Sequence, residues 1–356
     1  MSAESELLEK IRVLSRPVRI MHICGTHERT ISRYGLRDVL PAEIEVLSGP
    51  GCPVCVTPEE EIDRAIALAE SGVIITSFGD MMRVPGSNGS LMDARSRGCD
   101  VRMVYSIDDA IAIAKKDPRS KVVFFAIGFE TTAPTNAAAI LRNPPENFSL
   151  LLSHKLTIPA VSELIKEIEV DAFIAPGHVC TIIGVHPFQQ FAEQGFPIVA
   201  AGFEAVDLLL SIVMILEQMN GSGKYSAENA YPRAVRDEGN VRAQEMMYRV
   251  FEITDSQWRG LGTIKGSGLK LNPEFAKYDA SVIYADLISE KMKNISYEKS
   301  ASSLCHCAEI LKGKEKPDNC PLFSKKCTPS TPVGSCMVSQ EGMCYNWYRY
   351  RGADSA

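Results

Sequence analysis

The chain has 356 residues, enough for two compact domains and an appendage, and its formal net charge of −6 with no basic tract argues against a nucleic-acid partner. No apolar run reaches membrane length, and the Glu-rich residues 1–12 do not resemble a signal peptide. Eleven cysteines without an export signal therefore indicate a reducing, cytoplasmic location, where clustered cysteines favour metal binding or redox chemistry.

The first expected strand, residues 18–24, runs into a Cys-Gly-Thr-His-Glu motif that opens a helix. Cys24, His27 and Glu28 would then lie at the C-terminal end of a strand, where open α/β sheets place their ligand sites. Cysteine and histidine are ligands suited to iron or zinc. His27 could instead act as a base toward Cys24, or Cys24 could be a buried thiol beside a helix-starting glutamate.

A second strand, residues 44–48, leads into the Gly/Pro-rich loop 49–58, which contains a Cys-x-x-Cys pair. Cys52 and Cys55 at this spacing can form a disulfide, hold a metal, or act as a nucleophile and its resolving partner. A helix begins just after the loop, and a nearby helix N-terminus lowers the pKa of a thiol. A buried inert pair and half of a structural zinc site are the alternatives.

Strands alternate with helices through the first two thirds of the chain, which predicts parallel sheets joined by right-handed crossovers. The pattern restarts near residue 120. We therefore expect a first α/β lobe at residues 1–119 and a second at residues 120–220. A helical and extended return segment, residues 221–300, shows no chemistry, and a cysteine-rich domain follows at residues 301–356.

Three strands of the second lobe are expected to end in polar turns on one edge of its sheet. The turns carry Glu130, with Thr131 and Thr132 after it, then His178 and Glu204. Each residue alone could be a helix cap or a satisfied polar group. Their repetition at strand ends favours a shared cleft.

The tail concentrates six cysteines: Cys305, Cys307, Cys320, Cys327, Cys336 and Cys344. Four thiolates suit either zinc or an iron–sulfur cluster, and six are two more than one cluster needs. In an extended Cys-x-Cys segment the two side chains point to opposite faces, so Cys305 and Cys307 are expected to serve different centres. A zinc-stapled tail is the alternative.

Five ordered motifs together resemble the HypD family of hydrogenase maturation proteins. They are Cys-Gly-Thr-His-Glu at 24–28, the 49–58 loop, Gly-Phe-Glu-Thr-Thr-Ala-Pro at 128–134, Pro-Gly-His-Val at 176–179, and the tail segments 318–323 and 332–339. The resemblance implies two α/β lobes around a cleft, with a [4Fe-4S] domain. It also implies a scaffold on which the Fe(CN)₂CO unit of [NiFe]-hydrogenase is assembled with HypC and the cyanide-supplying HypE, on its way to the hydrogenase large subunit.

The resemblance also implies roles for individual cysteines. Cys24 would be the iron ligand, and Cys52 and Cys55 a redox dithiol. The cluster ligands would be Cys305, Cys320, Cys327 and Cys344, leaving Cys307 and Cys336 as a second thiol pair.

The chain departs from the family pattern at His306, which could compete as a ligand, at Cys180, where a serine is common, and at Asn319. Two other classes of function remain open. One is an iron–sulfur-linked thiol–disulfide oxidoreductase, and the other is a zinc-tailed binding protein.

Overall fold

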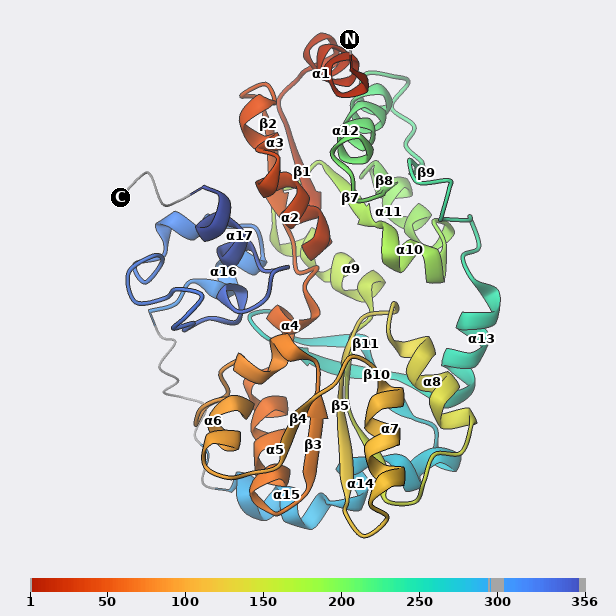
Figure 1. Cartoon of the computed structure of the whole chain (residues 1–356). Coiled ribbons are helices and arrows are strands. Elements are labelled where there is room, and N and C mark those ends of the chain that lie inside the picture. The colour runs from red at the N-terminus through yellow and green to blue at the C-terminus, as the bar shows by residue number, and fades with distance from the viewer. Residues whose placement is uncertain (1, 294, 296–303, 352–356) are drawn as a thin grey trace.

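The computed structural model describes residues 2–293, 295 and 304–351, and two parallel sheets organise them (Figure 1). The first sheet has the order β2-β1-β7-β8-β9 and the second the order β4-β3-β5-β6, while β10 and β11 form an antiparallel pair. The first sheet comprises β1 (Val18–His22), β2 (Ile44–Ser48), β7 (Ala172–Pro176), β8 (Ile198–Ala201) and β9 (Ala227–Asn229). The other strands are β3 (Ile74–Ser77), β4 (Val101–Met103), β5 (Val122–Gly128), β6 (Phe148–His154), β10 (Phe251–Trp258) and β11 (Gly262–Leu271).

Helices surround both sheets, and the tail lies to one side of them (Figure 1). Those near the first sheet are α1 (Ala3–Leu14), α2 (Gly25–Arg33), α3 (Leu36–Val39), α10 (Gly177–Ile183), α11 (Gln189–Glu193) and α12 (Ala205–Met219). Those near the second are α5 (Glu59–Glu70), α6 (Leu91–Ser96), α7 (Ile107–Lys116), α8 (Ala133–Leu141), α13 (Val241–Val250), α14 (Ala280–Ile283) and α15 (Ala285–Met292). Between them lie α4 (Pro53–Val56) and α9 (Thr157–Glu167), and the tail contributes α16 (Cys307–Leu311) and α17 (Met343–Tyr350). Short 3₁₀ helices occupy Gly79–Arg83, His186–Phe188, Pro273–Tyr278, Pro317–Asn319 and Ser335–Met337.

The strands do not divide between the sheets at residue 120, where the sequence placed the boundary between lobes. β1 pairs with β7, and β7 with β8, so the start of the chain shares a sheet with residues 172–201. β3 and β4 instead pair within the second sheet, where β5 joins β3 to β6. Alternation of strands and helices identifies the fold class but not which strands are neighbours, and this is why the boundary was misplaced.

The chain therefore passes between the sheets at defined points. After β2 it leaves the first sheet through the Cys-x-x-Cys segment and α4, and after β6 it returns through α9. Helix α13 ends at Val250, and the residues from Phe251 onward alternate between buried and exposed positions, as in a strand. This strand, β10, pairs with β11 into a hairpin that the sequence did not predict.

Burial explains why these strands form and how the tail is held. All seven residues of β5 are buried, as expected for an interior strand of a parallel sheet covered on both faces. One apolar cluster extends from Met21 and Leu47 through Phe125 to Trp347 in the tail, so the tail shares a core with both sheets. In the described part of the chain, no helix combines the length and apolarity needed to cross a membrane.

His154, the last residue of β6, is buried, and its ring makes an edge contact with Phe251. The Nδ2 of Asn136 donates a 2.8 Å hydrogen bond to Nε2 of this imidazole. Burial lowers the pKa of His154 to about 4, so the folded protein keeps the ring neutral.

We expect the free energy of unfolding to fall as the pH drops from about 6.5, the ordinary pKa of histidine, toward the lowered pKa of His154. In this pH window the imidazole binds a proton in the unfolded chain but not in the folded chain. The free energy of unfolding therefore falls by up to about 1.4 kcal/mol for each pH unit. Denaturant unfolding between pH 7.5 and 4.5 should give a shallower slope for His154→Gln than for the native chain. His186→Gln, at an exposed histidine, should keep the native slope; equal slopes in all three proteins would contradict this origin.

Candidate functional site

Cys24 lies at the junction of β1 and α2, where the Gly-Pro-Gly loop meets it. Its backbone is extended, and the N–H of Gly25 donates to the carbonyl of Gly51 at 3.1 Å. A side chain on Gly51 would collide with the Cys24 backbone, so only glycine permits this approach. The local sequence thus sets Cys24 directly against the loop that carries the Cys-x-x-Cys pair.

The tail closes over this junction through Glu341. The hydroxyl of Thr26 donates to Oε1 of Glu341 at 3.0 Å, although the two residues are 315 positions apart. Burial and the charge of Glu341 raise the pKa of the Cys24 thiol to about 12. Cys24 is therefore protonated at neutral pH, and a metal ion that bound it would displace the proton. No local pattern in the sequence pointed to Glu341.

His27 is fully buried and neutral. Its Nε2 lies 3.3 Å from the carbonyl of Ala201, which only accepts, so Nε2 carries the proton. Burial lowers the pKa of His27 to about 3. Its Nδ1 is buried without a hydrogen-bond partner among the described residues. The ring can therefore accept a hydrogen bond or bind a metal through Nδ1.

Glu28 is held within the fold by a buried ion pair. Its carboxylate accepts hydrogen bonds from Arg37 at 2.7 and 3.0 Å, from Ser32 at 2.6 Å, and from His22 at 3.0 Å. Burial opposes ionisation, but the charges and hydrogen bonds of Arg37 and His22 together outweigh it and lower the pKa of Glu28. Arg37 also donates to the Val46 carbonyl. The carboxylate that the sequence singled out thus braces α2 against β1 and β2.

Cys52 and Cys55 form a disulfide at the start of α4 and are both buried. The tail contacts this pair through Ser335. Its hydroxyl donates to the Cys55 carbonyl at 2.8 Å, and its own carbonyl lies 4.0 Å from Cys55 Sγ. The Cys-x-x-Cys segment therefore adjoins the cysteine-rich tail, a contact between segments 280 positions apart.

The six tail cysteines line one small cavity, walled by Ile310, Phe323 and Met337. The sulfurs of Cys307 and Cys336 are 3.0 Å apart. The premise that Cys305-His306-Cys307 is extended was wrong. His306 has φ −84° and ψ 20° and Cys307 begins α16, so the chain turns and both thiols face the same cavity.

The donor set of this cavity fits an iron–sulfur cluster. Thiol groups in an apolar, largely buried pocket are the usual environment, and backbone N–H groups commonly donate to the sulfurs. The N–H of Val333 donates to Cys327 Sγ at 3.3 Å. Over residues 2–293, 295 and 304–351, no group of three His, Cys, Asp or Glu side chains is arranged to hold a metal ion, so the fit lies in the type of donor and its apolar surroundings and not in a preformed ligand geometry. His306 pairs with Glu315 at 2.6 Å.

The residues expected on one sheet edge belong to two sheets. Glu130 follows β5 in the second sheet and accepts hydrogen bonds from Thr157 at 2.7 and 2.8 Å. His178 and Glu204 follow strands of the first sheet. The ring of His178 stacks on that of Phe203, with the ring centroids 3.8 Å apart. The expectation of a single edge was therefore wrong, because the strands were assigned to one lobe.

The other members of this group have local or exposed positions. Thr132 donates to the Ile127 carbonyl, Thr131 is half-buried, and the side chain of Glu204 is 75% exposed. Burial raises the pKa of the Cys180 thiol, and the negative charge of Glu130 adds to this effect.

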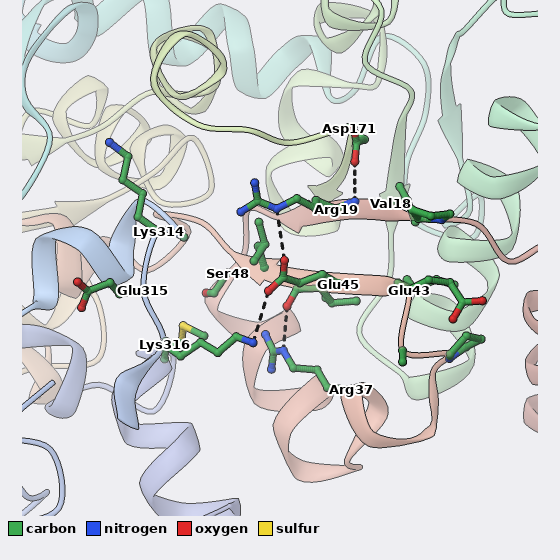
Figure 2. A pocket seen from close by; sticks show the side chains of 18 of the residues that line it. Val18, Arg19, Arg37, Glu43, Glu45, Ser48, Asp171, Lys314, Glu315 and Lys316 are labelled. Atoms are coloured by element: carbon green, nitrogen blue, oxygen red, sulfur yellow. Dashed lines mark hydrogen bonds and ion pairs between the residues drawn. The ribbon is translucent and has the colours of Figure 1, made fainter. Parts of the chain in front are cut away.

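A further cavity, of about 720 Å³, lies between β1, β2 and the tail, and no cysteine lines it. Arg19 and Lys316 both pair with Glu45 there, at 3.3 and 3.4 Å (Figure 2). Glu45 is thus shared by two cations, and none of the thiols described above borders this cavity.

Comparison with known proteins agrees with this arrangement of motifs. The family model described as "HypD: Hydrogenase formation hypA family" matches residues 2–351. A putative hydrogenase expression/formation protein of Methanocaldococcus jannaschii is 50% identical over 98% of this chain and 95% of its own length. Hydrogenase maturation factor HypD2 of Bradyrhizobium diazoefficiens is 47% identical over 94% and 90%, and HypD of Escherichia coli 42% over 96% and 91%. The chain belongs to the HypD family of hydrogenase maturation factors.

Proposed function

We propose that this maturation factor is the scaffold on which the Fe(CN)₂CO unit of [NiFe]-hydrogenase is assembled. One observation carries the proposal: three thiol-bearing segments far apart in the sequence are in direct contact. Thr26 binds Glu341 beside Cys24, and Ser335 binds Cys55 beside the tail cysteines. The partners would be a HypC-type chaperone and a HypE-type cyanide donor, with the hydrogenase large subunit as recipient.

In this proposal, Cys24 and a cysteine of the HypC-type partner hold the iron that is being assembled. Cys24 gives up its proton when iron binds, since burial keeps the free thiol protonated. Neutral His27, whose Nδ1 is free of other partners within the described chain, positions the thiolate or accepts a hydrogen bond near it. Backbone N–H groups at the turns after the strands favour the approach of an anion such as cyanide.

The tail would hold a [4Fe-4S] cluster through Cys305, Cys320, Cys327 and Cys344, all of which line the cavity. Such a cluster, when bound, supplies electrons one at a time. Cys307 and Cys336 are then left as a thiol pair with sulfurs 3.0 Å apart. Ser335 lies between this pair and the Cys52–Cys55 disulfide, with its hydroxyl 3.7 Å from Cys307 Sγ. The pair can therefore pass reducing equivalents to the disulfide by thiol exchange.

A thiol–disulfide oxidoreductase is the second candidate, favoured by the same contact between the disulfide and the tail. The two candidates differ in whether Cys24 is needed. An oxidoreductase would reduce protein disulfides without Cys24, whereas the scaffold would not load iron without it. Anaerobic purification with and without a HypC-type partner, followed by visible and infrared spectra, separates them. A colourless protein containing zinc would contradict both.

We expect Cys24→Ala to abolish the infrared cyanide and carbonyl bands that appear on co-expression with the HypC-type partner, while the brown colour persists. Removal of this thiol deletes the iron ligand but leaves the tail cysteines unchanged. Cys99→Ala, at a half-buried thiol between α6 and β4, is the matched control and should keep both signals. Cyanide bands that survive in Cys24→Ala would exclude Cys24 as the ligand.

We expect Cys320→Ser to lower the iron content from about four atoms per chain to below one, with loss of the visible absorption. Cys336→Ser should retain both, because we assign Cys336 to the exchange pair and not to the cluster. Iron analysis of the two variants, purified anaerobically without the partner, measures this difference. Equal loss of iron in the two variants would overturn the division of the six cysteines.

A further inference from the structure

A third cavity, of about 420 Å³, opens beside the redox thiols. Three segments wall it: Glu59 and Glu60 at the start of α5, the β10–β11 turn around Gln257 to Gly262, and the tail with Cys305 and Cys307. The sequence of the 221–300 segment suggested no chemistry there, yet its hairpin supplies one side of this cavity.

Cys307 is the member of the exchange pair that this cavity reaches. It lines the cavity, whereas Cys336, Cys52 and Cys55 do not. Cys307 retains 8% exposure, against 1% for Cys336 and 0% for Cys55. A small molecule in the cavity therefore meets Cys307, while the disulfide behind it is closed to solvent.

Arg259 fixes the geometry of this cavity. Its Nε donates to the Thr57 carbonyl and its Nη2 to the Pro85 carbonyl, both at 2.8 Å, and its backbone N–H donates to the Val56 carbonyl at 2.8 Å. These bonds attach the hairpin turn to the residues that follow Cys55. Gly260, at φ +80°, packs against the backbone of Ala308 in α16. The turn thus holds the Cys-x-x-Cys segment and the tail in a fixed relation.

We propose that this cavity is a thiol-access pocket, in which an external dithiol reductant binds and reduces the Cys307–Cys336 pair. The inference rests on the proposed exchange role of that pair.

The exchange balances as a two-electron, two-proton reaction. Cys307 thiolate attacks Cys55 Sγ, the Cys52–Cys55 bond breaks, and Cys52 leaves as a thiolate. Cys336 thiolate then attacks Cys307 Sγ, which closes the Cys307–Cys336 disulfide and releases Cys55.

The external dithiol regenerates the pair. One of its thiolates attacks Cys307 Sγ from the pocket and releases Cys336. Its second thiol then attacks the mixed disulfide, which releases Cys307 and closes the reductant into its own disulfide. The net result is that the dithiol is oxidised and Cys52–Cys55 is reduced.

The test places a large side chain at the pocket so that a reductant cannot enter. Gln257 is exposed and lines it, whereas Ile253, also exposed on β10 at 53%, does not. Purified anaerobic protein carrying the Cys52–Cys55 disulfide is mixed with dithiothreitol, quenched with an alkylating agent in denaturant so that buried thiols react, and analysed by peptide mass spectrometry. Alkylation of Cys52 and Cys55 over time gives the rate of reduction.

We expect Gln257→Trp to slow reduction roughly tenfold or more, because thiol exchange depends on access, and Ile253→Trp to leave the rate unchanged. Cys307→Ser, its iron content measured in parallel, should also lose the fast reduction. An unchanged rate in Gln257→Trp, or equal slowing in both tryptophan variants, would overturn the pocket assignment.

The proposal of the pocket and the proposal of the scaffold role can be contradicted independently of each other. A native rate in Gln257→Trp, in a protein that still gains cyanide bands with the HypC-type partner, would remove the pocket alone. Absence of those bands from the native chain would remove the scaffold role, whatever the reduction rates.

Discussion

The burial of the tail against both sheets is the constraint on which the candidate site depends. Trp347 and Cys336 share one apolar cluster with Met21 of the first sheet and Phe125 of the second. Only because this packing holds the tail in place can Glu341 reach Thr26 and Ser335 reach Cys55. The hydrogen bonds are individually worth about 1 kcal/mol, so apolar burial is what brings the thiols together and the polar contacts set their orientation.

Burial also sets the charge state of the site. It keeps the Cys24 thiol protonated and the His27 ring neutral, whereas Glu28 stays ionised because Arg37 pairs with it. The buried ion pair between Glu28 and Arg37 thus has a structural role in the motif. The thiol and the imidazole, which we propose face the iron, have no fixed charge of their own, so a cation that enters can take the thiolate as its counter-charge.

Local sequence patterns predicted the features that depend on neighbouring residues. The 44–48 strand and the motif at the end of β1 follow from apolar periodicity and turn residues, and two parallel sheets are confirmed. Other features depend on contacts between distant segments. These are the pairing of β1 with β7, the hydrogen bond between Thr26 and Glu341, and the hydrogen bond from Arg259 to the Thr57 carbonyl. Periodicity carries no information about such contacts, and the resemblance to a family supplied roles for the cysteines but not these neighbours.

The interleaving of the two sheets also bears on the order in which the chain can fold during synthesis. The second sheet uses consecutive strands, β3 to β6, so its strands are all available once residue 154 has emerged. β1 and β2 are made earlier but must wait for β7 and β8, and their exposed apolar edges are meanwhile open to wrong pairing. We expect the sheet of β3 to β6 to fold first, although its strands begin later in the sequence. The Cys-x-x-Cys segment connects β2 to this sheet, so we expect it to reach its final conformation last.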